Sequence, residues 1–121
     1  MIYIGTDIIE IERIEKSILK KSFLKKVYSE KELEWHEKNC FKAESLAGAF
    51  AAKESFSKAL GTGFRGFSLN EVEILHDNNG APYISLTGRA KEILNENQKI
   101  SVSISHCKKY AAATVLLFEN D

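Results

Sequence analysis

The sequence predicts an α+β protein in which a long central helix packs on a small antiparallel sheet. Residues 43–63 are rich in Ala, Leu, Glu and Lys and contain no proline, as is typical of a helix, and Gly61 stands where a helix commonly ends. Residues 99–105 alternate apolar and polar side chains and residues 110–118 are mostly apolar, so both are expected to form strands. Helical patterns come first and strands mostly later, an order that favours α+β over parallel βαβ repeats.

The composition indicates one intracellular domain, residues 1–121, which is long enough to bury about two-thirds of its unfolded surface. Cys40 and Cys107 are too few for a disulfide framework and match no zinc spacing, so reduced thiols and a cytoplasmic location are expected. Lys+Arg and Asp+Glu both total 17, which gives no global electrostatic argument for nucleic acid. No apolar stretch approaches membrane-spanning length, so no membrane partner is expected.

The N-terminal segment is expected to form a strand over residues 1–6, followed by a helix start. Asp7 and Glu10 have the spacing of a capping box, in which each side chain accepts a hydrogen bond from a backbone amide of the other. Asp7 nevertheless lies within the mostly apolar run IGTDIIEI, where an anion needs a partner. A helix cap and a metal ligand are both compatible with this residue.

Residues 13–31 form a locally basic segment that predicts short amphipathic helices. The cations are Arg13, Lys16, Lys20, Lys21, Lys25, Lys26 and Lys31, and apolar residues lie between them. This pattern is typical of a helix with one buried and one cationic face. An ordinary solvated face explains it too, and these residues alone favour that reading slightly.

The remaining elements follow from capping and turn signals. Ser29 and Glu32 predict a second capping box and a helix to about Lys38, with Asn39 as its stop. Residues 69–76 and 82–86 are expected to form a hairpin around the Asp-Asn-Asn-Gly turn at residues 77–80. Residues 87–96 are expected to form a short helix with Thr87 as its N-cap. Residues 99–105 and 110–118 are expected to pair antiparallel.

The long helix carries charges beside its apolar residues, which suggests a site. Glu54 and Lys58 are four residues apart and share one helix face, where a surface ion pair is the commoner explanation. Asp7 and Glu54 are the two carboxylates with least reason to lie in apolar surroundings, and two acids with phosphate oxygens suit magnesium. Lys58 would add a cation, and Gly61 and Gly63 would let backbone amides approach an anion, so these residues together describe a phosphate site.

Histidines and cysteines give weaker signals. His106 lies at a strand end, where either a loop hydrogen bond or a catalytic role is feasible. Cys107 follows it directly, but neighbours in an extended segment point to opposite faces, so a thiol–imidazole dyad is not expected. His36 and His76 are assigned no role.

The combined pattern of IGTDIIEIERI, FAAKESFSKALGTG, NGAPY and SISHCKKYAAA resembles the holo-acyl-carrier-protein synthase family. Its members are 4'-phosphopantetheinyl transferases, which move the 4'-phosphopantetheine arm of coenzyme A onto a serine of apo acyl carrier protein and release 3',5'-ADP. The resemblance covers essentially the whole chain. It implies the phosphopantetheinyl transferase fold and a homotrimer with sites at the subunit interfaces.

The resemblance also implies roles for individual residues. Asp7 and Glu54 match magnesium ligands, and Lys58 matches a lysine that neutralises phosphate charge, so these three are expected to be catalytic. Contacts to coenzyme A are expected from Phe50, Lys58, Gly61, Gly63, Pro82, Ser105 and His106, the last two reaching an adjoining subunit. An acidic helix of the carrier protein is expected to bind the basic patch, defined as Arg13, Lys20, Lys21, Lys25 and Lys26.

Two positions depart from the family pattern, and two other functions stay open. Ala49 replaces a frequent arginine and Ala81 a frequent lysine, so contacts to the coenzyme A 3'-phosphate are expected to differ, with Lys42 or Arg65 as substitutes. A non-catalytic module that binds acidic proteins would need only the basic patch. A nucleotide-binding enzyme with another chemistry would need only the phosphate site.

Overall fold

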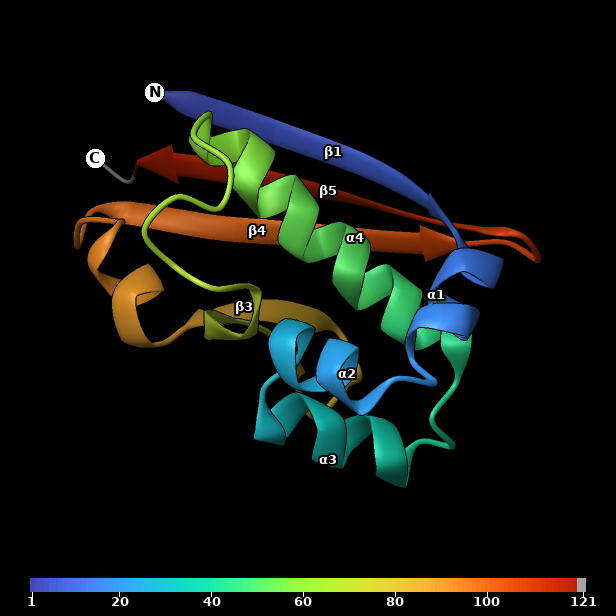
Figure 1. The fold of residues 1–121 in the computed structure, drawn as a ribbon. Coiled ribbons are helices and arrows are strands. Elements are labelled where there is room, and N and C mark those ends of the chain that lie inside the picture. Colours follow the sequence, from blue (N-terminus) through green and yellow to red (C-terminus); the bar gives the residue numbers. More distant parts are fainter. Residues whose placement is uncertain (120–121) are drawn as a thin grey trace.

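The structure is a computed structural model that describes residues 1–119 (Figure 1). Its elements in chain order are β1 (Ile2–Glu10), α1 (Ile11–Ser17), α2 (Lys21–Val27), α3 (Glu30–Lys38), α4 (Ala43–Leu60), the 3₁₀ turn η1 (Leu69–Glu71), β2 (Val72–His76), β3 (Pro82–Leu86), the 3₁₀ turn η2 (Gly88–Glu92), β4 (Gln98–His106) and β5 (Tyr110–Glu119). Within this part of the chain, no helix combines the length and apolarity needed to span a membrane.

The fold is α+β, with α4 lying across one face of an antiparallel sheet in the strand order β1-β5-β4 (Figure 1). A separate two-stranded hairpin, β2 and β3, lies with α2 and α3 beyond the β4 edge. Every second residue of β5 is buried on the face that packs against α4, namely Ala111, Ala113, Val115 and Leu117. The predicted pairing of the last two strands, the hairpin and the central helix are confirmed.

Strand β1 approaches α4 closely enough that one position must be glycine. A Cβ added at Gly5 would stand 2.6 Å from the amide nitrogen of Ala59 and closer still to the carbonyl oxygen of Ser55. Both atoms belong to the helix backbone, which cannot move aside as a flexible side chain can. Gly5 therefore sets how near the first strand lies to the central helix.

Helix boundaries follow their capping signals at two places. Ser29 caps α3 with the predicted box, since its hydroxyl accepts from the amide of Glu32 at 3.2 Å and Glu32 accepts from the amide of Ser29 at 3.0 Å. Helix α4 ends at Gly61, whose φ of 79° is the left-handed conformation that glycine adopts without a steric penalty. Both predictions are confirmed.

Three local predictions are wrong. Asp7 and Glu10 form no capping box, because β1 continues to Glu10 and Asp7 pairs with Ala113 of β5. The β-branched Ile8 and Ile9 favour this extension of the strand. Residues 69–71 form a 3₁₀ turn before β2, and the helix expected over 87–96 is the shorter 3₁₀ segment Gly88–Glu92. Thr87 does stand at its N-cap position, but its hydroxyl donates to the carbonyl oxygen of Glu71 at 3.4 Å and makes no capping hydrogen bond.

The face of the sheet opposite α4 exposes large apolar side chains. On β1 these are Ile2, Ile4 and Ile8, which are 69%, 66% and 66% exposed. Leu116 and Phe118 of the neighbouring strand β5 are half-buried and share this parity, since Ile4 pairs with Leu116 and Ile2 with Phe118. A contiguous apolar sheet face of this kind marks an interaction surface.

An ion pair lies completely buried between α3 and α4. Lys53 Nζ is 2.7 Å from Glu32 Oε1, and both side chains are 0% exposed. Lys53 also donates to the carbonyl oxygens of Val72 at 2.6 Å and Leu69 at 3.1 Å, and its Nζ lies 5.5 Å from the ring centroid of Tyr28. The lysine that interrupts the apolar pattern of the long helix therefore fastens α4 to α3 and β2.

His36 and His76 take part in an aromatic cluster between α3 and β2. The ring of His76 stacks on Trp35 at 3.8 Å, and His36 meets Tyr28 edge-on at 5.9 Å. His36 is 1% exposed, and among the described residues neither of its ring nitrogens has a hydrogen-bond partner. Burial, helped by the positive charges that His76 and Lys53 can carry, lowers the pKa of His36 to about 4.

Acidification is expected to destabilise the fold through His36. Its pKa falls from 6.5 in the unfolded chain to about 4 in the folded one, so the unfolded chain binds more protons between these values. The free energy of unfolding should therefore fall as the pH drops from about 6.5 to about 4, by up to about 3 kcal/mol. Urea unfolding at pH 7 and 4.5 measures this loss. Replacement His36→Leu should remove most of it, and equal losses in parent and variant would contradict the assignment.

Candidate functional site

Asp7 occupies the edge strand β1 and points toward α4. It has the same strand parity as Gly5 and Ile9, which are buried under the helix, and its side chain is 19% exposed. The strand thus holds a carboxylate at the margin of the core, as the apolar run around it predicts. Its backbone is fixed by pairing with β5.

Lys58 of α4 forms an ion pair with Asp7. Within residues 1–119 it forms no ion pair with Glu54, so the surface pair given above as the commoner explanation is not present. Lys58 Nζ lies 3.0 Å from Asp7 Oδ1 and also donates to the carbonyl oxygen of Thr6 at 3.1 Å. The lysine side chain is 55% exposed. Residues 51 positions apart in sequence therefore meet at one edge of the molecule, with the ammonium still accessible to an anion.

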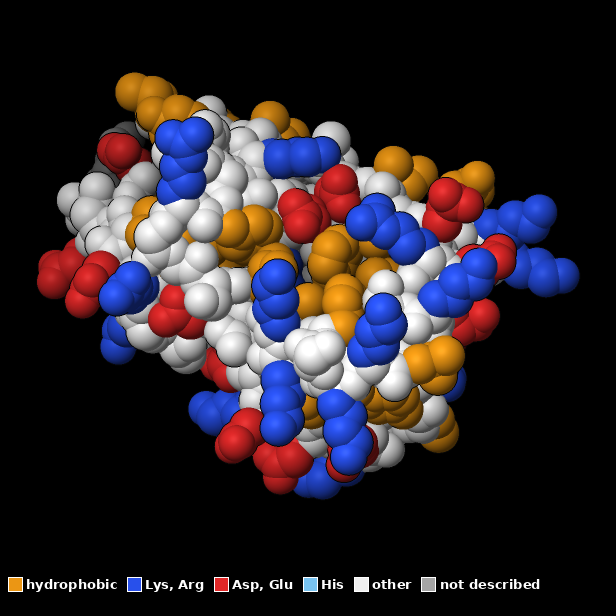
Figure 2. Space-filling view, in the orientation of Figure 1, with side chains coloured by type: hydrophobic (Ala, Val, Ile, Leu, Met, Phe, Trp, Pro, Cys, Tyr) orange, Lys and Arg blue, Asp and Glu red, His pale blue; other side chains and the backbone are white. Residues whose placement is uncertain are grey.

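Glu54 lies one turn before Lys58 on α4 and is half-buried. Burial raises the pKa of Glu54, and the nearby negative charge of Asp7 raises it further, whereas Lys58 and Arg13 act in the opposite direction. At the helix–strand junction, the charges of Asp7, Lys58 and Arg13 therefore lie close enough to act on Glu54. Figure 2 shows acidic side chains beside lysines on this edge of α4.

A divalent cation fits this pair chemically, because two partly buried carboxylates that repel each other offer hard oxygen ligands. Within residues 1–119 no group of three or more His, Cys, Asp or Glu side chains is arranged to hold a metal. The chain would therefore supply two ligands and leave the remaining positions to water or ligand oxygens. Magnesium is commonly bound in this way, by one or two carboxylates together with phosphates.

The glycine loop after α4 is open. Gly61 and Gly63 have φ values of 79° and 67°, and a Cβ at either position would meet no atom within 4 Å. Phe50, on the same helix, is half-buried and stacks on Phe23 of α2 with ring centroids 6.1 Å apart. The loop thus follows the helix turn that carries Lys58, while Phe50 is engaged with the helix that carries part of the basic patch.

Pro82, Ser105 and His106 lie apart from the carboxylate pair. Pro82 and His106 line a groove with Glu44, Ser45, Gly48, His76 and Ile104, which includes none of Asp7, Glu54 and Lys58. Ser105 is exposed and has the strand parity of the sheet face that bears the exposed isoleucines. One chain therefore does not bring all the predicted coenzyme A contacts together.

All five residues of the basic patch are exposed, on α1, on α2 and in the turn between them. Apolar residues of the same helices, such as Ile14 and Val27, are buried, as the amphipathic pattern predicts. Leu19 is an exception, because it lies between the helices and is 83% exposed. Lysine and arginine side chains are spread over this side of the molecule in Figure 2. The positions expected to replace lost 3'-phosphate contacts, Lys42 and Arg65, are exposed too, whereas Ala49 is buried.

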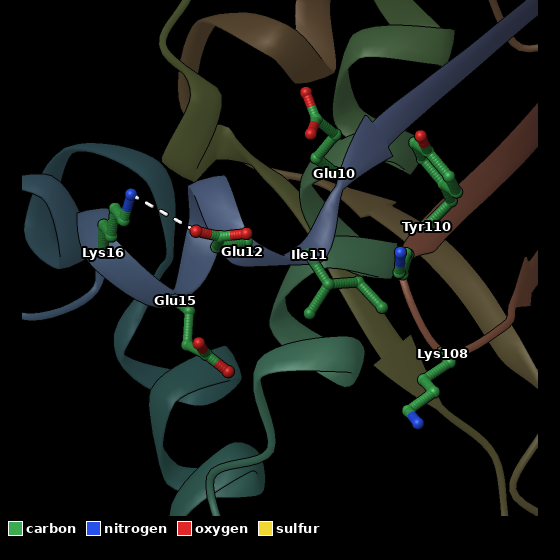
Figure 3. A pocket seen from close by; sticks show the side chains of 8 residues that line it. Glu10, Ile11, Glu12, Glu15, Lys16, Lys108 and Tyr110 are labelled. Atoms are coloured by element: carbon green, nitrogen blue, oxygen red, sulfur yellow. Dashed lines mark ion pairs between the residues drawn. The ribbon is translucent and has the colours of Figure 1, made fainter.

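A wide depression lies where β1 passes into α1 beside the β4–β5 turn (Figure 3). Three acids and three lysines line it with two other residues: Glu10, Ile11, Glu12, Glu15, Lys16, Lys108, Lys109 and Tyr110. Glu12 and Lys16 neutralise each other at 3.4 Å, the dashed pair in Figure 3. The mixture of charges favours neither an anion nor a cation here, so the carboxylate pair is the better candidate site.

Comparison with known proteins identifies the family. Residues 3–115 match the model of the 4'-phosphopantetheinyl transferase superfamily. A holo-[acyl-carrier-protein] synthase from Fusobacterium nucleatum is 50% identical over 120 residues, covering 97% of this chain and 98% of the relative. Another from Clostridium botulinum (strain Alaska E43) is 44% identical over 116 residues, covering 94% of both chains.

Solved structures of such synthases share the fold. A holo-(acyl-carrier-protein) synthase from Bacillus anthracis in complex with CoA (3',5'-ADP) superposes with a TM-score of 0.81 at 34% identity, covering 98% of this chain and 96% of that one. The Neisseria meningitidis synthase gives a TM-score of 0.87 at 32% identity, covering 98% of this chain and 100% of that one. The resemblance inferred from the sequence motifs is thereby confirmed at the level of family and fold.

Proposed function

Because this chain belongs to the holo-[acyl-carrier-protein] synthase family of the 4'-phosphopantetheinyl transferase superfamily, we propose that it transfers the 4'-phosphopantetheine arm of coenzyme A to apo acyl carrier protein. A serine oxygen of the carrier protein bonds to the phosphorus that bears the arm. The bond from that phosphorus to the pyrophosphate bridging oxygen breaks, 3',5'-ADP leaves, and the serine proton is released. No covalent enzyme intermediate is needed.

The observation that carries this proposal is the meeting of Asp7, Glu54 and Lys58 at one edge of α4. The transfer builds negative charge on the phosphoryl group and on the leaving nucleotide, and fixed positive charge lowers the energy of that state. Lys58 keeps its ammonium accessible beside Asp7, where it can bind a phosphate oxygen. Gly61 and Gly63 leave the following loop open for a nucleotide.

Magnesium is part of the proposal. Asp7 and Glu54 would hold the ion, and when bound it would neutralise pyrophosphate charge and polarise the phosphoryl group. The two carboxylates bind a cation only while they are ionised. The free, exposed Cys40 and Cys107 support a reducing compartment, the cytoplasm, as the location.

The proposed enzyme is a homotrimer whose subunits pack through the exposed sheet face. Ile2, Ile4 and Ile8 supply the apolar surface for this contact. Ser105 shares that sheet face, and His106 follows it at the end of β4. In the proposed trimer, these two residues of one subunit contact the nucleotide that is bound by its neighbour. Light scattering on the purified chain measures the subunit number.

One mass measurement tests the activity. The purified chain is incubated with coenzyme A, magnesium and apo acyl carrier protein, and the carrier protein should gain the mass of the phosphopantetheine arm. A module that only binds acidic proteins would leave the mass unchanged. Parallel incubations with ATP and other nucleotides reveal an enzyme with a different chemistry.

The basic patch is proposed to bind the acidic carrier protein. Replacements Lys20→Glu and Lys25→Glu together should raise the KM for the carrier protein about 10-fold at low salt, since exposed charges act over about one Debye length. The effect should shrink in about 0.5 M salt, where that length falls well below 10 Å. The pair Lys38→Glu and Lys91→Glu makes the same change in net charge elsewhere on the exposed surface. Equal KM values for the two double variants would remove the patch from the binding surface.

A further inference from the structure

Ser55 links the central helix to the strand that supports Asp7. Its side chain is fully buried, and its hydroxyl lies 2.9 Å from the carbonyl oxygen of Ala113 and 2.8 Å from that of Ala51. Ala113 is the residue directly opposite Asp7 in the β1–β5 pair. Ser55 itself follows Glu54. One hydroxyl therefore connects the residue next to one carboxylate with the strand partner of the other.

Gly5 makes a second connection at the same place. Two residues before Asp7, it packs against the helix backbone at Ser55 and Ala59 without room for a methyl group. The strand can lie this near to α4 only because position 5 has no side chain. On the exposed side of this contact, Lys58 of α4 donates hydrogen bonds to the Asp7 carboxylate and to the carbonyl oxygen of Thr6.

These contacts bear on the distance between the carboxylates of Asp7 and Glu54, on which cation binding depends. Two carboxylates bind one small cation only when their oxygens converge on it, and magnesium tolerates little deviation from its octahedral geometry. Asp7 and Glu54 belong to different elements, so their separation is fixed by how strand β1 sits on α4. Ser55 and Gly5 lie at that contact, where the Ser55 hydroxyl is hydrogen-bonded to the backbone carbonyls of Ala51 and Ala113 and Gly5 packs against the helix backbone.

We propose that Ser55 and Gly5 are positioning residues that set the separation of Asp7 and Glu54, and with it the affinity of this pair for a divalent cation. The inference rests on the proposed function, because it assumes the metal site described there. Losing the Ser55 hydroxyl loosens the helix from β5 opposite Asp7. Adding a methyl group at Gly5 pushes β1 away from α4.

Direct binding of Mn²⁺, followed by electron paramagnetic resonance with coenzyme A present, tests this proposal. Ser55→Ala should raise the dissociation constant for Mn²⁺ about 10-fold, the scale on which residues behind metal ligands act. Gly5→Ala should raise it further, with a lower melting temperature. Ser57→Ala is the matched control, since Ser57 is buried on the same helix but donates only to the carbonyl of Glu54 within that helix.

The outcomes separate this inference from the function beneath it. Weaker Mn²⁺ binding by Ser55→Ala, with Ser57→Ala within about twofold of the parent, supports the positioning role. If the parent binds Mn²⁺ and Ser55→Ala binds it equally well, the positioning role alone is overturned. If the parent binds no Mn²⁺ with coenzyme A present, the metal site of the proposed function fails, and this inference fails with it.

Discussion

Replacement of Glu54 by glutamine is expected to lower the rate of phosphopantetheine transfer about 100- to 1000-fold, the scale on which a single charge-stabilising group acts in catalysis. The amide keeps the size of the side chain but carries no charge, and a neutral oxygen is a much weaker partner for a divalent cation. The free energy of unfolding should not decrease. Burial and the charge of Asp7 both raise the pKa of Glu54, so in the folded chain its negative charge is unfavourable and its removal relieves repulsion.

Three measurements check this expectation: the mass gained by the carrier protein over time, Mn²⁺ binding with coenzyme A present, and thermal unfolding. Glu37→Gln is the matched control, because Glu37 is an exposed glutamate of α3 and its replacement removes the same charge. Its transfer rate should stay near that of the parent. A fully active Glu54→Gln enzyme would show that this carboxylate holds no metal in the reaction.

The helices and strands that the sequence predicted well are those with local signals. The ends of α3 and α4 depend on Ser29, Glu32 and Gly61, each of which acts within one turn of its own position. The hairpin follows from the Asp-Asn-Asn-Gly turn at residues 77–80 between two segments of strand-like pattern. Such signals need no knowledge of the tertiary structure, so a single sequence contains them.

Asp7 shows where local reasoning fails. Its spacing to Glu10 satisfies the capping box, yet the strand continues because β5, over a hundred residues later, offers a full row of backbone partners. The pairing of nine residues outweighs one cap, which is typically worth about 1 kcal/mol. The same carboxylate was expected at the core margin from its apolar neighbours, and that expectation holds. The burial of this side chain was thus easier to predict than the secondary structure of its backbone.

Lys53 is the residue whose role sequence reasoning missed. A lysine within an apolar helix pattern could face solvent or pair inside, and nothing near it in sequence distinguishes the two. Its partner Glu32 lies 21 positions away on another helix, and its other acceptors are the carbonyls of Leu69 and Val72. Only the packing of α3 and β2 on α4 brings these groups together.

Lys53→Met is accordingly expected to cause the largest loss of stability, about 3–5 kcal/mol, the range for breaking a buried ion pair. The uncompensated partner is Glu32, whose pKa is already raised by burial and is held down by Lys53. Without the lysine, this pKa rises further above its unfolded value, and the folded chain then binds more protons than the unfolded one. The loss of stability should therefore be larger at pH 8 than at pH 5.

Urea unfolding of three variants at both pH values tests this account. Lys38→Met removes an exposed lysine of α3 and should change stability by no more than about 0.5 kcal/mol. The double variant Glu32→Gln with Lys53→Met should recover part of the loss and most of the pH dependence. The recovery is expected to be partial because Glu32 accepts from the backbone amides of Ser29 and Ile74 through different oxygens, and the glutamine amide offers only one oxygen. If the single and double variants were equally unstable at both pH values, the loss would come from altered packing, because a buried charge without its partner must respond to neutralisation.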